Sequence, residues 1–124
     1  MIPKFAKVVN ILGTKYSIAI KSFKDEPRFE KRSIDGYHDG ILKQIVVVDM
    51  HSYPGYEDES EEMICETMKQ TLRHEIVHAF LCESGLDECS GQYECAWAKN
   101  EEMVDWIALQ GTKIYEAWKK AGAI

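Results

Sequence analysis

The longest helical pattern in the chain spans residues 58–84 and reads DESEEMICETMKQTLRHEIVHAFLCES. Its apolar residues recur at helical spacing, at positions 64, 68, 72, 76, 79 and 80. Asp58 has Glu61 three residues later, which is the pattern of a capping box with aspartate as the cap. Gly85 follows the pattern and suits the left-handed position that ends many helices. We therefore predict a helix over residues 58–84, either continuous, bent or divided into two.

A small β-sheet is predicted before this helix. Residues 5–12 and 16–23 read as a β-hairpin, because apolar and polar residues alternate in the second segment and Gly13 supplies a turn between the two. A third strand is predicted over residues 41–50, whose centre is a β-branched apolar run. Residues 24–40 are polar and contain turn residues, so we predict irregular structure there.

After the long helix we predict a loop over residues 86–98, with or without a short turn of helix, and a last helix over about residues 99–120. The apolar residues on one side of this last helix are Met103, Ile107, Ile114 and Trp118. The order β-β-β-α-α indicates an α+β fold, in which a small antiparallel or mixed sheet of three or so strands, within residues 5–50, packs on two main helices. The length predicts a single domain over residues 1–124.

Charge and hydropathy exclude some kinds of partner. The net charge of −6 argues against a nucleic-acid partner, because binding to phosphates needs a basic surface. No apolar stretch approaches the roughly 20 residues that span a bilayer, so no membrane partner is expected. The first residues carry lysines without a following apolar segment, so we see no signal peptide and expect a cytoplasmic protein.

The four cysteines, at positions 65, 82, 89 and 95, form no CxxC pair. This spacing does not support a zinc ribbon or a thioredoxin-type site. Without a secretion signal we expect free thiols. Cys65 and Cys82 fall on the long helix as small core residues, whereas Cys89 and Cys95 fall in the predicted loop.

The long helix contains the motif His74-Glu75-Ile76-Val77-His78, which has the form HExxH. Residues four apart leave the same face of a helix one turn apart, so both imidazoles can reach one zinc ion at about 2.0–2.1 Å. Glu75 projects beside the open coordination position, where it can take a proton from water that the metal activates. A histidine pair at this spacing can also be a simple polar stripe. The apolar flanks favour the zinc site, because a polar pair on so apolar a helix needs a partner.

The last helix offers the remaining ligand in the segment Asn100-Glu101-Glu102-Met103-Val104-Asp105. Together with HExxH, this segment resembles the thermolysin-like gluzincins, which carry Asn-Glu-x-x-x-Asp on a downstream helix. The resemblance implies that Glu101 is the third zinc ligand and that Asp105 orients His74. Glu102 is a rival ligand because it is adjacent, but only Glu101 keeps the spacing to the aspartate.

The resemblance covers residues 71 to about 108 and implies a minimal zincin-like fold. The segments 72–75 and 100–106 also resemble small zincin-like proteins encoded in phages and prophages of Gram-positive bacteria. A more distant resemblance is to the metallopeptidases that cleave phage repressors. In zincins an edge strand binds the peptide backbone, and residues 41–50 are the natural candidate here.

We therefore expect a zinc-dependent peptidase that acts on a protein or peptide substrate, with Glu75 as the general base. The alternative is a non-catalytic zinc-binding module of phage or prophage origin, with a regulatory or interaction role. Glu75 favours the peptidase, because a structural site has no use for a carboxylate beside an open position. A further donor to the oxyanion is left open among four residues: His38, His51, Tyr53 and Tyr93. The sequence does not indicate the oligomeric state or the cleavage preference.

Overall fold

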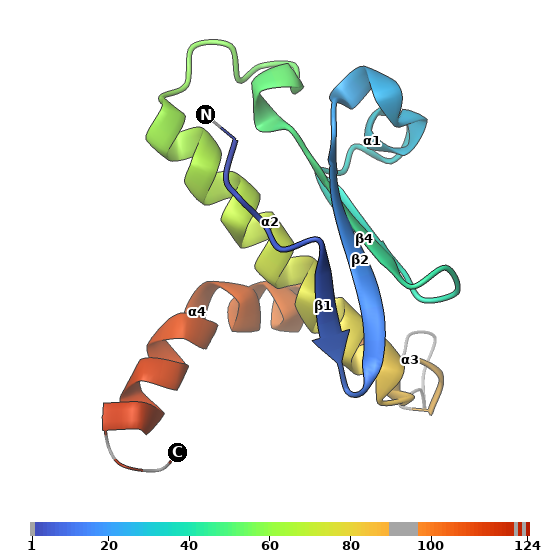
Figure 1. Cartoon of the computed structure of the whole chain (residues 1–124), viewed down its shortest axis with the longest axis vertical. Helices are drawn as coiled ribbons and strands as arrows, with labels where there is room; N and C mark the ends of the chain where they lie inside the picture. Colours follow the sequence, from blue (N-terminus) through green and yellow to red (C-terminus); the bar gives the residue numbers. More distant parts are fainter. Residues whose placement is uncertain (1, 90–96, 121, 123) are drawn as a thin grey trace.

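A computed structural model describes residues 2–89, 97–120, 122 and 124 of the 124-residue chain, with side chains for all of these except residues 88, 89, 97 and 117–120. The fold is α+β: a four-stranded mixed sheet lies against one long helix, and a second long helix crosses the first (Figure 1). This is the predicted class, with one strand more than expected.

The sheet has the strand order β1-β2-β4-β3. Its strands are β1 (Val8–Ile11), β2 (Thr14–Lys21), β3 (Gly36–Asp39) and β4 (Gln44–Val48). β1 and β2 form the predicted hairpin, β2 pairs with β4 in parallel, and β3 pairs with β4 antiparallel. β4 is therefore interior to the sheet, and its four apolar residues at 45–48 are fully buried.

The prediction for residues 24–40 was wrong. This segment contains a short 3-10 helix η1 (Phe23–Asp25), helix α1 (Pro27–Arg32) and strand β3. β3 escapes prediction because its four residues have no apolar alternation, and it forms because β4 offers an edge to pair with. The edge strand beside the long helix is consequently β3, whereas the predicted edge segment 41–50 holds β4, which is paired on both sides.

The long helix, α2, runs without interruption over Glu61–Glu83. Its N-cap is Ser60, whose side chain accepts a hydrogen bond from the backbone N–H of Met63 at 3.1 Å, so the prediction of Asp58 as the cap was wrong. Ile64, Met68 and Ala79 are buried in one cluster with the apolar residues of the strands. This burial fixes α2 across one face of the sheet (Figure 1).

A 3-10 helix, η2 (Met50–Ser52), follows β4, and three helical segments follow α2: α3 (Leu86–Cys89), the 3-10 helix η3 (Trp97–Lys99) and α4 (Glu101–Lys120). The Asn100 side chain accepts a hydrogen bond from the Met103 backbone N–H at 2.9 Å and so caps α4, which begins two residues after the predicted start. α4 crosses α2 at its N-terminal half (Figure 1), where Val104 and Ala108 are buried. Arg73 Nε on α2 donates to the Ala108 carbonyl at 3.0 Å and fixes the crossing.

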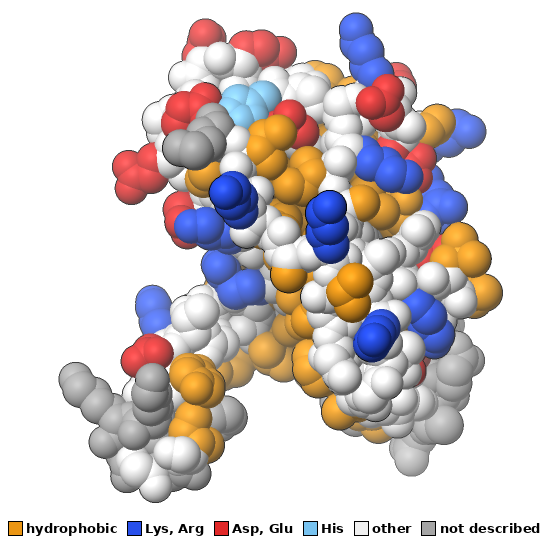
Figure 2. Space-filling model, viewed as in Figure 1, with side chains coloured by type: hydrophobic (Ala, Val, Ile, Leu, Met, Phe, Trp, Pro, Cys, Tyr) orange, Lys and Arg blue, Asp and Glu red, His pale blue; other side chains and the backbone are white. Residues whose placement is uncertain are grey.

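Met103, Ile107 and Ile114 of the predicted apolar stripe on α4 are half-buried. The side chain of Trp118, the fourth residue of the stripe, lies outside the described part of the structure, and so does the side chain of Trp97. Toward its C-terminal end α4 stands away from the body, and hydrophobic side chains line the gap (Figure 2). Within the part of the chain that the structure describes, every helix is too short or too polar to cross a lipid bilayer.

Candidate metal centre

Side chains from two helices converge at the α2–α4 crossing. Nε2 of His78 lies 3.1 Å from Nε2 of His74. The carboxylate of Glu101 spans the pair, with Oε2 3.2 Å from His74 Nε2 and Oε1 3.0 Å from His78 Nε2. These three residues are a group that could hold a metal ion. They are the three ligands that the sequence predicts.

The spacing of these atoms matches a small tetrahedral cation. With bonds of about 2.0–2.1 Å, the ligand atoms of a tetrahedral zinc site lie roughly 3.3 Å apart. The three separations here, 3.0, 3.1 and 3.2 Å, are close to that value. Two imidazole nitrogens and one carboxylate are also the donor set of a catalytic zinc site, which keeps its fourth position open. The residues therefore fit zinc in both chemistry and size.

Asp105 fixes the state of the first histidine. Its Oδ1 lies 2.5 Å from Nδ1 of His74, so Nδ1 carries the proton and donates it to the carboxylate. Nε2 of His74 is then left as an acceptor whose lone pair points at the space between the three donors. Asp105 lies one helical turn after Glu101, so the α2–α4 crossing presents both carboxylates to His74.

Glu75 lies next to this centre and is only 6% exposed. Its Oε1 is 3.9 Å from Nε2 of His74, and its Oε2 is 3.7 Å from Nδ1 of His38 on β3. The approach of β3 depends on Gly36, where an added Cβ would lie 2.6 Å from Cγ2 of Thr71 and 3.5 Å from Cγ of Glu75. A carboxylate is thus held between the His74–His78 pair and strand β3.

A cleft of about 700 Å³ opens over the centre. Its walls come from residues 32–38, from three residues within 50–56, from the side of α2 that carries His74, Glu75 and His78, and from the first turns of α4. On α4 the lining residues are Glu101 and Asp105. Glu102, the rival ligand, is not among the described residues that line this cleft. The geometry therefore favours Glu101 over Glu102.

The structure distinguishes the four candidate oxyanion donors by their positions. His38 and Tyr53 line the cleft, and the His38 ring stacks on that of His78 with centroids 5.2 Å apart. His51 is engaged elsewhere, since its Nδ1 lies 2.7 Å from Asp49 Oδ1 and its Nε2 lies 2.8 Å from Glu61 Oε2. Tyr93 lies outside the described residues. His38 is thus a cleft residue whose ring also lies 3.7 Å from the Glu75 carboxylate.

The sequence did not single out two polar residues of the cleft, Asp35 and Thr71. The Thr71 hydroxyl lies 3.1 Å from Asp35 Oδ2 and 3.0 Å from the Thr67 carbonyl. This contact joins the start of β3 to α2 one turn before Glu75. It joins positions 36 residues apart in sequence, so no local spacing signals it.

The side chains of two cysteines are described, and the thiol of Cys82 is free, as predicted. Cys65 and Cys82 are half-buried rather than fully in the core. Cys95 and the side chain of Cys89 lie outside the described residues.

Comparison of the chain with protein-family models, curated proteins and solved structures finds no match.

Proposed function

We propose that the protein is a zinc-dependent peptidase that hydrolyses peptide bonds, with His74, His78 and Glu101 as zinc ligands and Glu75 as the general base. The observation that carries the proposal is the position of Glu75. This buried carboxylate lies 3.9 Å from a metal-binding nitrogen, within a cleft, and takes no part in the donor set itself. A structural zinc site fills its coordination with protein ligands and needs no such neighbour.

The chemistry follows from the positions of the side chains. A bound zinc ion lowers the pKa of water toward about 7 and polarises a carbonyl group. Glu75 is placed to take the proton from the attacking water and to return it to the leaving amine. His38 faces Glu75 across 3.7 Å and lies at the cleft wall, where it can donate to the oxygen on which negative charge develops. Asp105 holds His74 in the tautomer that metal binding requires.

The substrate that suits this cleft is an extended peptide. β3 is one of the two edge strands of the sheet and contributes Gly36, Tyr37 and His38 to the cleft wall. A peptide can add to such an edge by main-chain hydrogen bonds, which bind the backbone independently of sequence. The carbonyl to be cleaved would then lie between β3 and the α2 histidines. This placement replaces the segment 41–50 as the expected peptide-binding edge.

The test has two steps. Metal analysis of purified protein is expected to find one zinc bound at the HExxH centre, lost in the double variant His74→Ala/His78→Ala. Glu75→Gln is expected to keep that zinc and to lose cleavage of a mixed peptide library by at least about 100-fold, the usual size of a general-base contribution. Glu102→Gln is the matched control, since it removes a carboxylate next to Glu101 that does not line the cleft. Unchanged cleavage by Glu75→Gln would exclude its role as the base.

The second candidate is a non-catalytic zinc-binding module that binds a partner. The observation in its favour is the exposed apolar surface of α4, where Trp106 is 57% and Leu109 is 45% exposed on one side of the helix. A wild-type protein that holds zinc yet leaves every peptide of the library intact would favour this function over the peptidase.

A further inference from the structure

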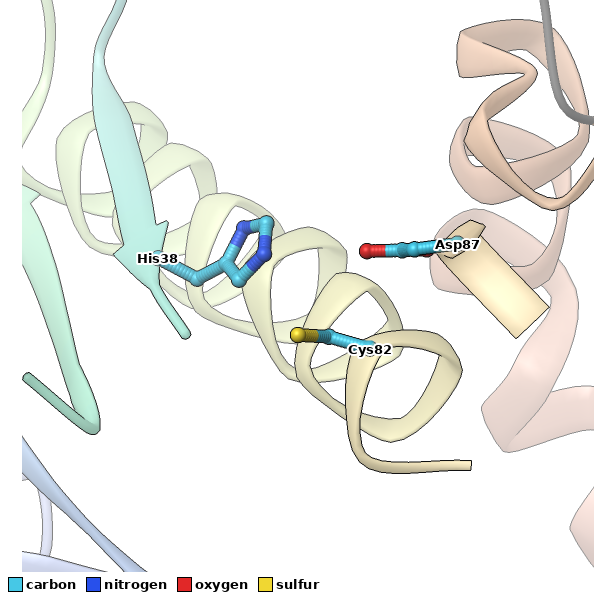
Figure 3. A group of neighbouring side chains, drawn as sticks. All are labelled: His38, Cys82 and Asp87. Carbon is cyan, nitrogen blue, oxygen red and sulfur yellow. The ribbon is translucent and has the colours of Figure 1, made fainter. Parts of the chain in front are cut away.

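A second group of metal-binding side chains lies beside the HExxH centre. His38 on β3, Cys82 in the last turn of α2 and Asp87 on α3 each offer one ligand atom, and these atoms all lie within 4.8 Å of one another. Figure 3 shows the three side chains pointing into one space from three different elements. All three are half-buried, so the group lies within the fold rather than on an open surface.

Asp87 is the first sign that this group has a ligand. Its Oδ1 is buried and has no hydrogen-bond partner, and it is the only buried side-chain oxygen or nitrogen in that state among the described residues. A buried carboxylate oxygen that lacks a hydrogen-bond partner destabilises the fold, because it has lost its water and gained nothing in return. In Figure 3 the carboxylate points across the space toward the ring of His38. A cation bound between them would satisfy this oxygen.

Cys82 is the second sign, because the fold makes room for its sulfur. A Cβ added at Gly40 would lie 2.6 Å from Cys82 Sγ, so only glycine at this position lets the thiol lie where it does. A divalent cation binds cysteine as the thiolate, so an ion held by this group would displace the proton of the Cys82 thiol.

We infer that His38, Cys82 and Asp87 form a second site for a divalent transition-metal ion of the zinc class, separate from the HExxH centre. One imidazole, one thiolate and one carboxylate are ligands that zinc accepts in tetrahedral sites, with water in the fourth position. Calcium and magnesium ions do not suit this group, because both ions select oxygen donors.

The second ion would act on the HExxH centre through His38. Nδ1 of His38 lies 3.7 Å from Oε2 of Glu75, which leaves the other ring nitrogen to face Cys82 and Asp87. A metal on that nitrogen fixes the proton on Nδ1, where it faces the carboxylate of Glu75. The same ion would tie α3 to β3 and to the end of α2. It thus serves as a positioning ion for the edge strand and for Glu75.

Cobalt(II) titration of the metal-free protein tests the inference, because only the second site contains sulfur. A thiolate bound to Co²⁺ gives a charge-transfer band in the near ultraviolet, which nitrogen and oxygen ligands do not give. We expect the wild type to bind two equivalents of Co²⁺ and to show the band. The variant His74→Ala/His78→Ala should bind one equivalent and keep the band, so the result does not depend on the peptidase proposal.

Variants assign the band to these residues. Cys82→Ser should lose the band, whereas Cys65→Ser, a matched change on the same helix, should keep it. Asp87→Asn preserves the packing and should weaken Co²⁺ binding by about 10-fold or more. Gly40→Ala should also weaken Co²⁺ binding, because the added Cβ displaces the Cys82 sulfur while all three ligand residues are retained. A wild type without the band, or a band that survives in folded Cys82→Ser protein, would overturn the inference.

Discussion

Oδ1 of Asp105 on α4 lies 2.5 Å from Nδ1 of His74 on α2, across the crossing of the two helices. The contact sets the tautomer of His74 and holds its ring so that Nε2 points at His78 and Glu101. A side chain that orients a ligand in this way strengthens metal binding without touching the metal.

Asp105→Ala is therefore expected to weaken zinc binding by about 10- to 100-fold while leaving the fold intact. Competition with a chromophoric chelator measures the affinity, and circular dichroism checks the helices. Glu102→Ala removes a similar charge from the same helix turn and should change the affinity by less than about 3-fold, the size of a weak surface charge effect. Equal losses in the two variants would show that Asp105 acts only through its charge.

Gly36 sets the distance between β3 and α2. An alanine there would place its Cβ 2.6 Å from Cγ2 of Thr71 and 3.0 Å from the Val46 carbonyl, so either the strand or the helix must shift. We expect Gly36→Ala to lower the free energy of unfolding by about 1–3 kcal/mol, which is typical of overpacking. It should also lower any peptidase activity, because Glu75 moves with α2. Urea unfolding and peptide cleavage measure the two effects.

Gly111→Ala is the control for this prediction. Gly111 lies within α4, and an added Cβ meets no described atom within 4 Å. Alanine should stabilise the helix there by about 0.5–1 kcal/mol, because glycine loses more backbone entropy on folding. A destabilisation by Gly111→Ala as large as that by Gly36→Ala would contradict the steric explanation.

The parts of the site that the sequence predicts are those set by helix geometry. His74 and His78 share a face because four residues make about one turn, and the same rule brings Glu101 and Asp105 together on α4. What joins the two pairs is the crossing of α2 over α4, which spacing alone does not encode. The resemblance of the two motifs to the gluzincins predicts that step, and in the structure Glu101 lies 3.2 Å from His74 and 3.0 Å from His78.

The rest of the site depends on contacts between distant residues. β3 forms from a polar segment because β4 offers backbone groups to pair with. This pairing makes β4 an interior strand, so the prediction that residues 41–50 form the edge was wrong. His38, Cys82 and Asp87 come from three elements with no shared spacing, so only the folded chain reveals them as a group. Ser60 and Asp58 are both good N-cap residues, and the position where α2 packs on the sheet decides between them.

His51 should make the stability of the protein depend on pH. Hydrogen bonds to Glu61 first, and then to Asp49, raise the pKa of His51 in the folded state above its ordinary value of about 6.5. A raised pKa stabilises the fold fully below the ordinary value, and this contribution is lost as the pH rises through the folded-state pKa. The difference in stability between wild type and His51→Gln is therefore expected to be largest at acidic pH, as long as both carboxylates stay ionised.

Urea unfolding of both proteins at several pH values, from slightly acidic to slightly alkaline, measures this difference. Comparing the two proteins at each pH removes the contributions of the other histidines, which both share. A difference that grows as the pH rises would contradict the expected sign.

Removing the metal should loosen α4. The N-terminal half of this helix is held on α2 by Glu101 and Asp105, both of which act through the histidines of the centre. A ligand that binds only the folded state stabilises it by about 4 kcal/mol at 1,000 times its dissociation constant. We therefore expect a chelator to lower the thermal midpoint of the wild type by several degrees, the shift that a few kcal/mol produce in a domain of this size.

The control is the triple variant Cys82→Ser/His74→Ala/His78→Ala. It lacks ligands at both proposed sites and should unfold at the same temperature with and without chelator. A wild-type midpoint that does not change on chelation, in protein shown to have held zinc, would mean that the metal does not couple α4 to α2.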